Sequence, residues 1–296
     1  MDIYAEVTDR IIKELEAGII PWDKPWSGVS SGAISHSTGK PYSLINQILL
    51  GKAGEYITFN QCKTEGGKVR KGAKSKMVVF WKMILQERKD EAGQTIRDEN
   101  GLPMSKSIPM LRYYNVFHID DCEGIKAKYG DEEMPNIAKP VEEAEFVIKD
   151  YSTRAHLTVE HRKQDRAYYS PKQHLVSLPL MEQFVDTAEY YSATFHELTH
   201  STGHKSLLDR FTEESGIASF ASESYSKEEL IAEIGACAIL HEMGMETKQS
   251  FRNSAGYIQG WLKALQNDKR LIISAASRAE KAIKLILGVE TEEDKE

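Results

Sequence analysis

The chain has 296 residues, of which 41% are hydrophobic and 28% are charged, proportions typical of an ordinary globular protein. Its formal net charge of −7 argues against a protein that binds polyanions over its whole surface. The three cysteines, Cys62, Cys122 and Cys237, lie far apart, which favours reduced thiols over a disulfide scaffold or a cysteine-ligated zinc site.

The sequence contains no recognisable membrane span or secretion signal. No apolar run approaches the ~18 residues that a transmembrane helix needs. The first residues lack the basic and apolar regions of a signal peptide. We therefore expect a cytoplasmic protein with no membrane partner. The length allows two domains, each with a core of its own.

The first half of the chain predicts a mixed α/β region. Apolar residues at helical spacing indicate a helix over residues 3–19, which Gly18 and Pro21 terminate. The polar stretch 86–106 predicts a long hairpin excursion. Segments rich in β-branched and aromatic residues predict strands at 56–59, 77–81 and 111–117.

Basic and aromatic residues are concentrated in this half. Lys and Arg outnumber Asp and Glu by 12 to 8 over residues 1–85, and the loop 66–75 combines basic residues with glycines that allow close approach to a phosphate. A groove for single-stranded nucleic acid needs this mixture, because phosphates attract basic side chains and unpaired bases stack on aromatic rings. The predicted DNA-binding residues are Trp22, Trp26, Tyr42, Lys68, Arg70, Lys71, Lys74, Lys76, Trp81 and Tyr113.

Two other interpretations of this region have to be weighed. Each aromatic residue could instead fill the core, where large apolar rings are commonly buried. The glycine-rich loop also nearly matches a nucleotide-binding P-loop, but that pattern needs Gly-Lys-Ser, and Ala73 separates Gly72 from Lys74. The segment that follows is strand-like, whereas a P-loop opens a helix. We therefore reject nucleotide hydrolysis.

The second half of the chain begins after a polar segment that predicts a linker over residues 129–140. A helix is expected at 141–150. Short strands are expected around 157–159, 167–169 and 174–178, and two closing helices at 257–266 and 271–287. Between the last strand and these closing helices lies the strongest motif of the chain.

That motif is His-Glu-x-x-His, formed by His196, Glu197 and His200 on a predicted helix. Residues four apart share one helical face, so the two imidazoles can grip one Zn²⁺ or another divalent ion such as Mn²⁺. Glu197 beside them can act as general base toward a water molecule at the metal. The alternative is a surface helix that carries unrelated histidines.

A zinc hydrolase site needs a third protein ligand and an open position. The metzincin pattern would place a third His at position 206, which is Ser206, so that arrangement fails. A downstream helix, expected to start at the N-cap Ser226, resembles the second helix of gluzincin-type zinc peptidases. The resemblance implies that Glu229 ligates the metal and that Glu233 hydrogen-bonds a ligand histidine, although the reverse order of the two acids stays open. His204, beyond the expected helix end, is predicted either to hydrogen-bond a group next to the metal ligands or to have a structural role.

Several segments in sequence order resemble ArdC-type antirestriction proteins. In the first half these are residues 20–26, 56–61, 66–75 and 113–117, and in the second half residues 196–204 continuing through Leu208-Asp209-Arg210. The resemblance covers nearly the whole chain. It implies an α+β fold of two domains. Residues 1–128 would be a mixed α/β domain that binds single-stranded DNA, 129–140 a linker, and 141–296 a zincin-like metallopeptidase domain with a small sheet and a mostly helical core.

The same resemblance implies a plasmid-type protein that protects incoming conjugative DNA from host restriction. Two function hypotheses follow. In the first, the protein binds single strands and cuts a restriction-modification protein or another DNA-bound protein nearby. In the second, it only coats DNA, and the metal site is structural or catalytically idle. A structural zinc gains nothing from a general base, so Glu197 favours the first hypothesis.

Overall fold

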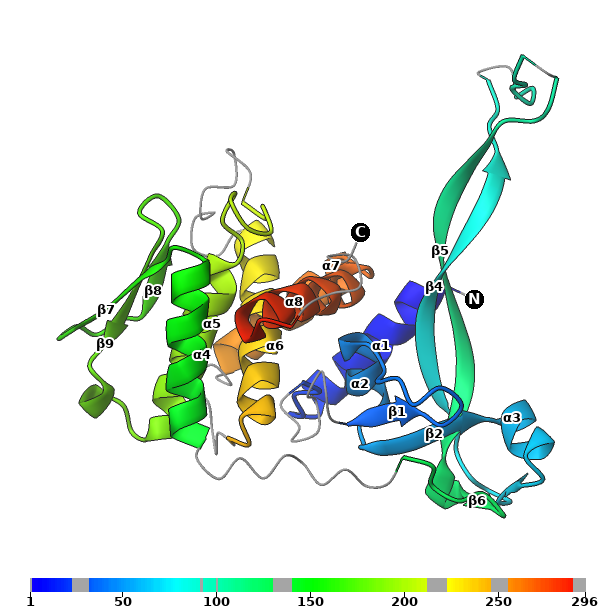
Figure 1. Cartoon of the computed structure of the whole chain (residues 1–296), viewed down its shortest axis with the longest axis horizontal. Coiled ribbons are helices and arrows are strands. Elements are labelled where there is room, and N and C mark those ends of the chain that lie inside the picture. Colours follow the sequence, from blue (N-terminus) through cyan, green and yellow to red (C-terminus); the bar gives the residue numbers. More distant parts are fainter. Residues whose placement is uncertain are drawn as a thin grey trace.

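The computed structural model describes residues 2–22, 32–90, 93–99, 101–129, 140–211, 223–245 and 255–289. It shows an α+β protein with a mixed sheet and a long hairpin at one end and a group of helices beside a small sheet at the other (Figure 1). The predicted fold class is therefore confirmed. No helix within these ranges is long and apolar enough to cross a membrane.

The N-terminal sheet contains four strands in the order β1-β2-β5-β4. Strand β1 pairs with β2 in parallel, and the other two pairings are antiparallel. Directly after β2, helix α3 leads into a separate two-stranded ladder, β3 with β6. The elements of this region are β1 (Ala33–Ser35), β2 (Gly54–Thr58), α3 (Phe59–Thr64), β3 (Lys68–Val69), β4 (Lys76–Glu87), β5 (Ser105–His118), a 3-10 turn (Ile119–Asp121) and β6 (Cys122–Glu123).

Strands β4 and β5 extend far beyond the sheet as a two-stranded arm, which stands out in Figure 1. Their pairing begins at Lys76↔Val116 in the sheet and continues to Glu87↔Ser105. The predicted hairpin excursion over 86–106 is thereby confirmed, and both strands are longer than the sequence indicated. An isolated two-stranded ribbon is only marginally stable in water, so the arm depends on its anchored base.

The C-terminal region places a three-stranded sheet, in the order β7-β9-β8, beside the helices (Figure 1). The three strands and both closing helices lie within a few residues of their predicted positions. The predicted start of α6 at Ser226 is wrong, because the helix begins at Glu223. The elements are α4 (Pro140–Arg154), β7 (Thr158–Arg162), β8 (Tyr168–Ser170), β9 (Leu175–Pro179), a 3-10 turn (Met181–Gln183), α5 (Thr187–Ser201), α6 (Glu223–Glu242), α7 (Ala255–Asn267) and α8 (Leu271–Leu287).

Two N-terminal helices, α1 (Ile3–Glu16) and α2 (Leu44–Leu50), pack against the C-terminal helices α7 and α8. Apolar residues from both halves therefore form one continuous core. The hydroxyl of Thr8 donates to the carbonyl of Lys269 at 2.7 Å across this contact. The domain boundaries stay a prediction, and most of the expected linker lies outside the described residues.

Trp22, predicted to stack on DNA bases, is instead part of this core. Its side chain is 1% exposed, and its ring meets the edge of Trp261 on α7 with centroids 5.3 Å apart. A ring enclosed in this way offers no face to a base, so the prediction for Trp22 is wrong. Trp26 lies outside the described residues.

Trp22→Ala should therefore destabilise the whole chain, because it leaves a large cavity where the two halves meet. We expect a loss of about 3–5 kcal/mol of unfolding free energy, measured by denaturant or thermal unfolding. Trp81→Ala, which removes a ring that is 51% exposed, is the matched control and should change stability little. Equal stability of both variants would contradict the shared core.

Candidate metal centre

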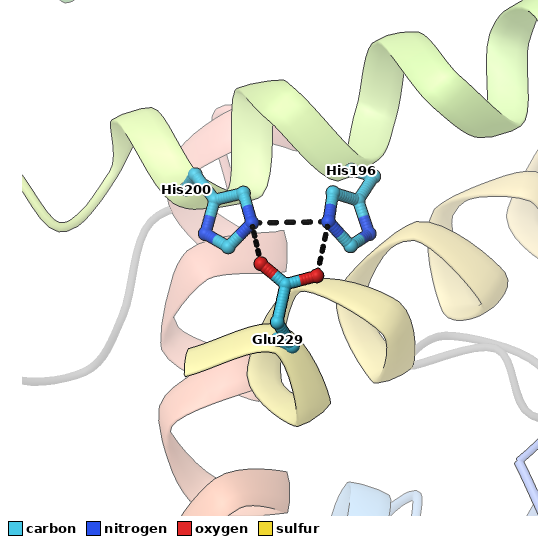
Figure 2. A group of neighbouring side chains, drawn as sticks. All are labelled: His196, His200 and Glu229. Atoms are coloured by element: carbon cyan, nitrogen blue, oxygen red, sulfur yellow. Dashed lines mark hydrogen bonds and ion pairs between the residues drawn. The ribbon is translucent and has the colours of Figure 1, made fainter. Parts of the chain in front are cut away.

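Helix α5 presents both histidines of the motif on its buried side. The helix starts cleanly because the side chain of Asp186 accepts a hydrogen bond from the backbone N–H of Glu189. The side chain of His196 is buried, and that of His200, one turn later, is partly buried. Both rings point toward α6, which crosses α5 on this side (Figure 2).

The crossing is close because α6 has a glycine at the contact. A Cβ atom added to Gly235 would lie 2.7 Å from Cγ2 of Thr199, closer than real Cβ contacts. Thr199 lies between His196 and His200 on α5, so this contact fixes α6 beside the two ligands. Glu229, six residues before Gly235 on α6, then reaches the histidines from the opposite side.

The three donor groups meet at one point, as Figure 2 shows. Nε2 of His196 lies 3.0 Å from Nε2 of His200. The Glu229 carboxylate is 3.5 Å from the first nitrogen and 3.2 Å from the second. Ligands placed tetrahedrally at zinc–nitrogen distances stand ~3.3 Å apart, so these spacings fit a single tetrahedral metal ion. His196, His200 and Glu229 form the metal site that the sequence predicted.

The outer nitrogens of both histidines face carboxylates that also come from α6. Nδ1 of His196 is buried and lies 3.6 Å from Oε2 of Glu233, within ion-pair distance but beyond a hydrogen bond, so the predicted hydrogen bond between the two is not formed. Nδ1 of His200 lies 3.4 Å from Oε1 of Glu228. A carboxylate on the outer nitrogen fixes which nitrogen carries the proton and raises the basicity of the ligand.

Sequence reasoning missed Glu228 and its partner Arg210. The Arg210 guanidinium donates to both carboxylate oxygens of Glu228, at 2.6 and 3.2 Å. It also donates to the backbone carbonyl of Thr199 and the hydroxyl of Thr202. Arg210 thus ties the end of α5 to Glu228 and holds that carboxylate against His200. The only sequence signals were the position of Glu228 next to Glu229 and the ArdC-like segment that includes Arg210.

The electrostatics of the cluster favour a cation. Burial alone would raise the pKa of Glu229, but hydrogen bonds with His196 and His200 hold it below its ordinary value. Burial alone would lower the pKa of His200, yet hydrogen bonds with Glu228 and Glu229 raise it to about 10. The carboxylates of Glu228, Glu229 and Glu233 surround the two imidazoles, so a bound cation is stabilised in this largely buried site.

Glu197, the predicted general base, is buried on α5 with 6% exposure, and its charge acts on His200. His204 lies beyond the end of α5. Its ring stacks on His174 with centroids 4.1 Å apart, and its Nδ1 is 2.7 Å from the hydroxyl of Ser206. These contacts favour the structural role, which is one of the two roles predicted for His204.

The remaining DNA-binding candidates lie in the N-terminal region, and none is tested by the arrangement alone. The basic residues of the glycine-rich loop and β3 are exposed, and Lys76 and Tyr42 are partly buried. Packing explains the glycine at position 67, because a Cβ atom there would collide with the side chain of Ile125. Trp81 and Tyr113 are exposed on the arm.

Comparison with known proteins agrees with this architecture. Residues 143–278 match the family model of a zincin-like metallopeptidase, and residues 1–117 match the N-terminal domain of anti-restriction factor ArdC. The crystal structure of antirestriction ArdC protein from plasmid R388, metal-free, superposes with a TM-score of 0.71 at 36% identity and covers 97% of each chain. Its Mn(II)-bound structure superposes with a TM-score of 0.71 at 33% identity over 97% of this chain and 98% of that one.

The chain thus combines an ArdC N-terminal domain with a zincin-like metallopeptidase domain. It belongs to the family of ArdC-type antirestriction proteins. It is also 32% identical over 306 aligned positions to the DNA primase TraC of Escherichia coli, spanning 99% of this chain but 28% of the primase. An uncharacterized protein of Sinorhizobium fredii, y4eC, is 31% identical over 94% of this chain and 89% of its own length. The chain therefore spans only about a quarter of the length of the related primase.

Substitutions in the metal site should separate ligands from supporting residues. His196→Ala, His200→Ala or Glu229→Ala should abolish stoichiometric binding of Zn²⁺, because two remaining ligands hold a metal poorly. Affinity should also fall as the pH is lowered, because protons compete for the imidazoles. Binding is measured by competition with a chromogenic chelator.

Glu228→Gln and Glu233→Gln should each keep the site but weaken Zn²⁺ binding roughly 10–100-fold, because each removes a carboxylate behind a ligand. Glu16→Gln, an exposed change on α1, is the control and should leave affinity unchanged. Full occupancy after loss of both histidines would contradict the site. Loss of all binding in Glu233→Gln with normal binding in Glu229→Ala would show that the two acids exchange roles.

Proposed function

We propose that this protein binds single-stranded DNA through its N-terminal region and carries a zinc-dependent peptidase site, and that it protects incoming conjugative DNA from restriction in the cytoplasm of the recipient cell. The observation that carries the peptidase part is the donor set of two imidazoles and one carboxylate with Glu197 beside it. The donor set also suits Mn²⁺, the ion named for the R388 structure.

The number of ligands supports a catalytic role over a structural one. Structural zinc sites are closed by four protein ligands, whereas catalytic sites use three and keep one position open. In the part of the chain that the structure describes, three donors converge here. This observation favours a peptidase over the second candidate, a protein that only coats DNA.

The residues of the site divide the chemistry among them. When bound, the metal supplies Lewis acidity that polarises a substrate carbonyl and makes water more acidic. His196, His200 and Glu229 would hold it, and Glu228 and Glu233, whose carboxylates face the outer nitrogens, would orient the two rings. The buried carboxylate of Glu197 would take the proton from the attacking water and return it to the leaving amine.

The DNA-binding part is supported by the exposed basic residues of the N-terminal region and by membership in the family. The substrate of the peptidase is proposed to be a restriction-modification protein or another protein bound to the same DNA. Binding to DNA would raise the local concentration of such a substrate around the site.

The Glu197→Gln variant tests the peptidase directly, because it removes the base and keeps the ligands. The zinc-loaded wild type should cleave unfolded β-casein or a basic protein bound to single-stranded DNA, detected by gel electrophoresis and mass spectrometry. The variant should bind zinc and an oligonucleotide as the wild type does, yet lose cleavage at least 100-fold. Cleavage by the variant at the wild-type rate would contradict the role of Glu197. No cleavage of either substrate by the wild type would favour the DNA-coating alternative.

A further inference from the structure

The pairing of β4 with β5 divides the side chains of the arm between two faces. In an antiparallel ladder, residues directly opposite each other point to the same side, and alternate residues point to opposite sides. Phe80 pairs with Arg112, and Val78 pairs with Tyr114, so these four share one face. The core confirms the division, because Val78 packs with Tyr56 whereas its neighbour Val79 belongs to the main core.

All basic residues of the paired segment fall on this first face, which we call the basic face. Between Lys76 and Gln86 on β4 and between Lys106 and Val116 on β5, it carries no Asp or Glu. Lys82, Lys106 and Arg112 are exposed. The basic face consists of Lys76, Val78, Phe80, Lys82, Ile84 and Gln86 with Lys106, Ile108, Met110, Arg112, Tyr114 and Val116.

The opposite face, the apolar face, has no basic residue along the same segment. Near its base it packs into the main core through Val79 and Leu111. Trp81 lies beside Tyr4 of α1, with ring centroids 6.4 Å apart. The apolar face consists of Met77, Val79, Trp81, Met83, Leu85 and Glu87 with Ser105, Ser107, Pro109, Leu111, Tyr113 and Asn115.

Aromatic rings are set among the positive charges of the basic face. Phe80 and Tyr114 lie with centroids 5.4 Å apart and are 40% and 38% exposed. Burial, and after it the neighbouring Tyr114, raises the pKa of Tyr42. Arg112 lies directly opposite Phe80 in the ladder, and Lys76, where the paired segment begins, follows directly on the glycine-rich loop.

We propose that single-stranded DNA lies on the basic face of the arm, with its bases stacked on Phe80 and Tyr114 and its phosphates on Lys82, Lys106 and Arg112. The proposal rests on the single-stranded DNA binding proposed above and names the surface that performs it. Unpaired bases stack on any exposed ring, and basic side chains release counterions from the phosphates. A face that sets aromatic rings among basic side chains offers both interactions, and the apolar face has no basic residue to pair with a phosphate.

This assignment differs from the residues that the sequence favoured. Trp81 and Tyr113 are exposed and aromatic, but the register places both on the apolar face. Phe80, Lys82 and Arg112 were not among the predicted DNA-binding residues. Adjacent residues of a strand point to opposite sides, and only the pairing of the strands shows which residues share a face.

The experiment measures binding of a fluorescein-labelled 20-nucleotide oligo-dT by fluorescence anisotropy at several salt concentrations, with the full chain. Phe80→Ala/Tyr114→Ala should weaken binding at least tenfold. Lys82→Ala/Arg112→Ala should also weaken it and should lower the slope of log affinity against log salt concentration by about 1.4, since each phosphate contact contributes about 0.7. The second variant changes only exposed side chains, so it remains informative if the first fails to fold.

Trp81→Ala/Tyr113→Ala is the matched control, because it removes the same kind of rings from the opposite face. Its affinity should stay within threefold of the wild type. A tenfold loss in this control, together with wild-type binding by both basic-face variants, would overturn the proposed surface. If the wild type itself fails to bind oligo-dT, the proposed DNA binding fails as well, which is a distinct outcome.

Discussion

The close crossing of α5 and α6 is the constraint on which the site depends. Gly235 lets α6 approach until its backbone lies against Thr199, between the two ligand histidines. Any side chain at this position would push the helices apart and move Glu229 away from them. The same approach brings Glu228 and Glu233 behind the rings, so one helix supplies the third ligand and both orienting carboxylates. Burial of this polar cluster is tolerated because its charges are paired with one another.

The arm and the metal centre are attached to a common body of helices. The side chain of Asn46 on α2 donates to the carbonyl of Val79 and accepts from its N–H, which covers the open edge of β4 at the base of the arm. The first turn of the same helix is also held by α8, where Glu280 accepts a hydrogen bond from the backbone N–H of Leu44. Together with the contact between Trp22 and Trp261, these bonds anchor the arm to the helices that support the metal site.

The sequence predicted those features that depend on local spacing. The spacing of four residues between His196 and His200 is enough to place both on one face of a helix. Glu229 was predicted from the resemblance of its segment to the second helix of gluzincin-type zinc peptidases. Features that depend on tertiary contacts were not accessible. Arg210 reaches Glu228 only because the chain turns back toward α6 after α5. The distance between the two residues in the sequence does not indicate this contact.

The aromatic residues show the same limit more clearly. Trp22 in a proline-rich loop has the composition of an exposed binding residue, yet the packing of α7 buries it. Phe80 and Trp81 are adjacent and chemically alike, and only the register with β5 separates them into different faces. Sequence patterns thus selected the metal ligands, but among the aromatic residues they did not separate buried from exposed rings or one face of the arm from the other.

X-ray absorption at the zinc edge of the full chain, loaded with one equivalent of Zn²⁺, tests the metal centre most directly. We expect nitrogen and oxygen scatterers at about 2.0–2.2 Å, with the multiple-scattering pattern of two imidazoles and no sulfur in the first shell. A sulfur scatterer at about 2.3 Å, or a spectrum that does not change when His196 and His200 are both replaced by Ala, would contradict a site built from α5 and α6.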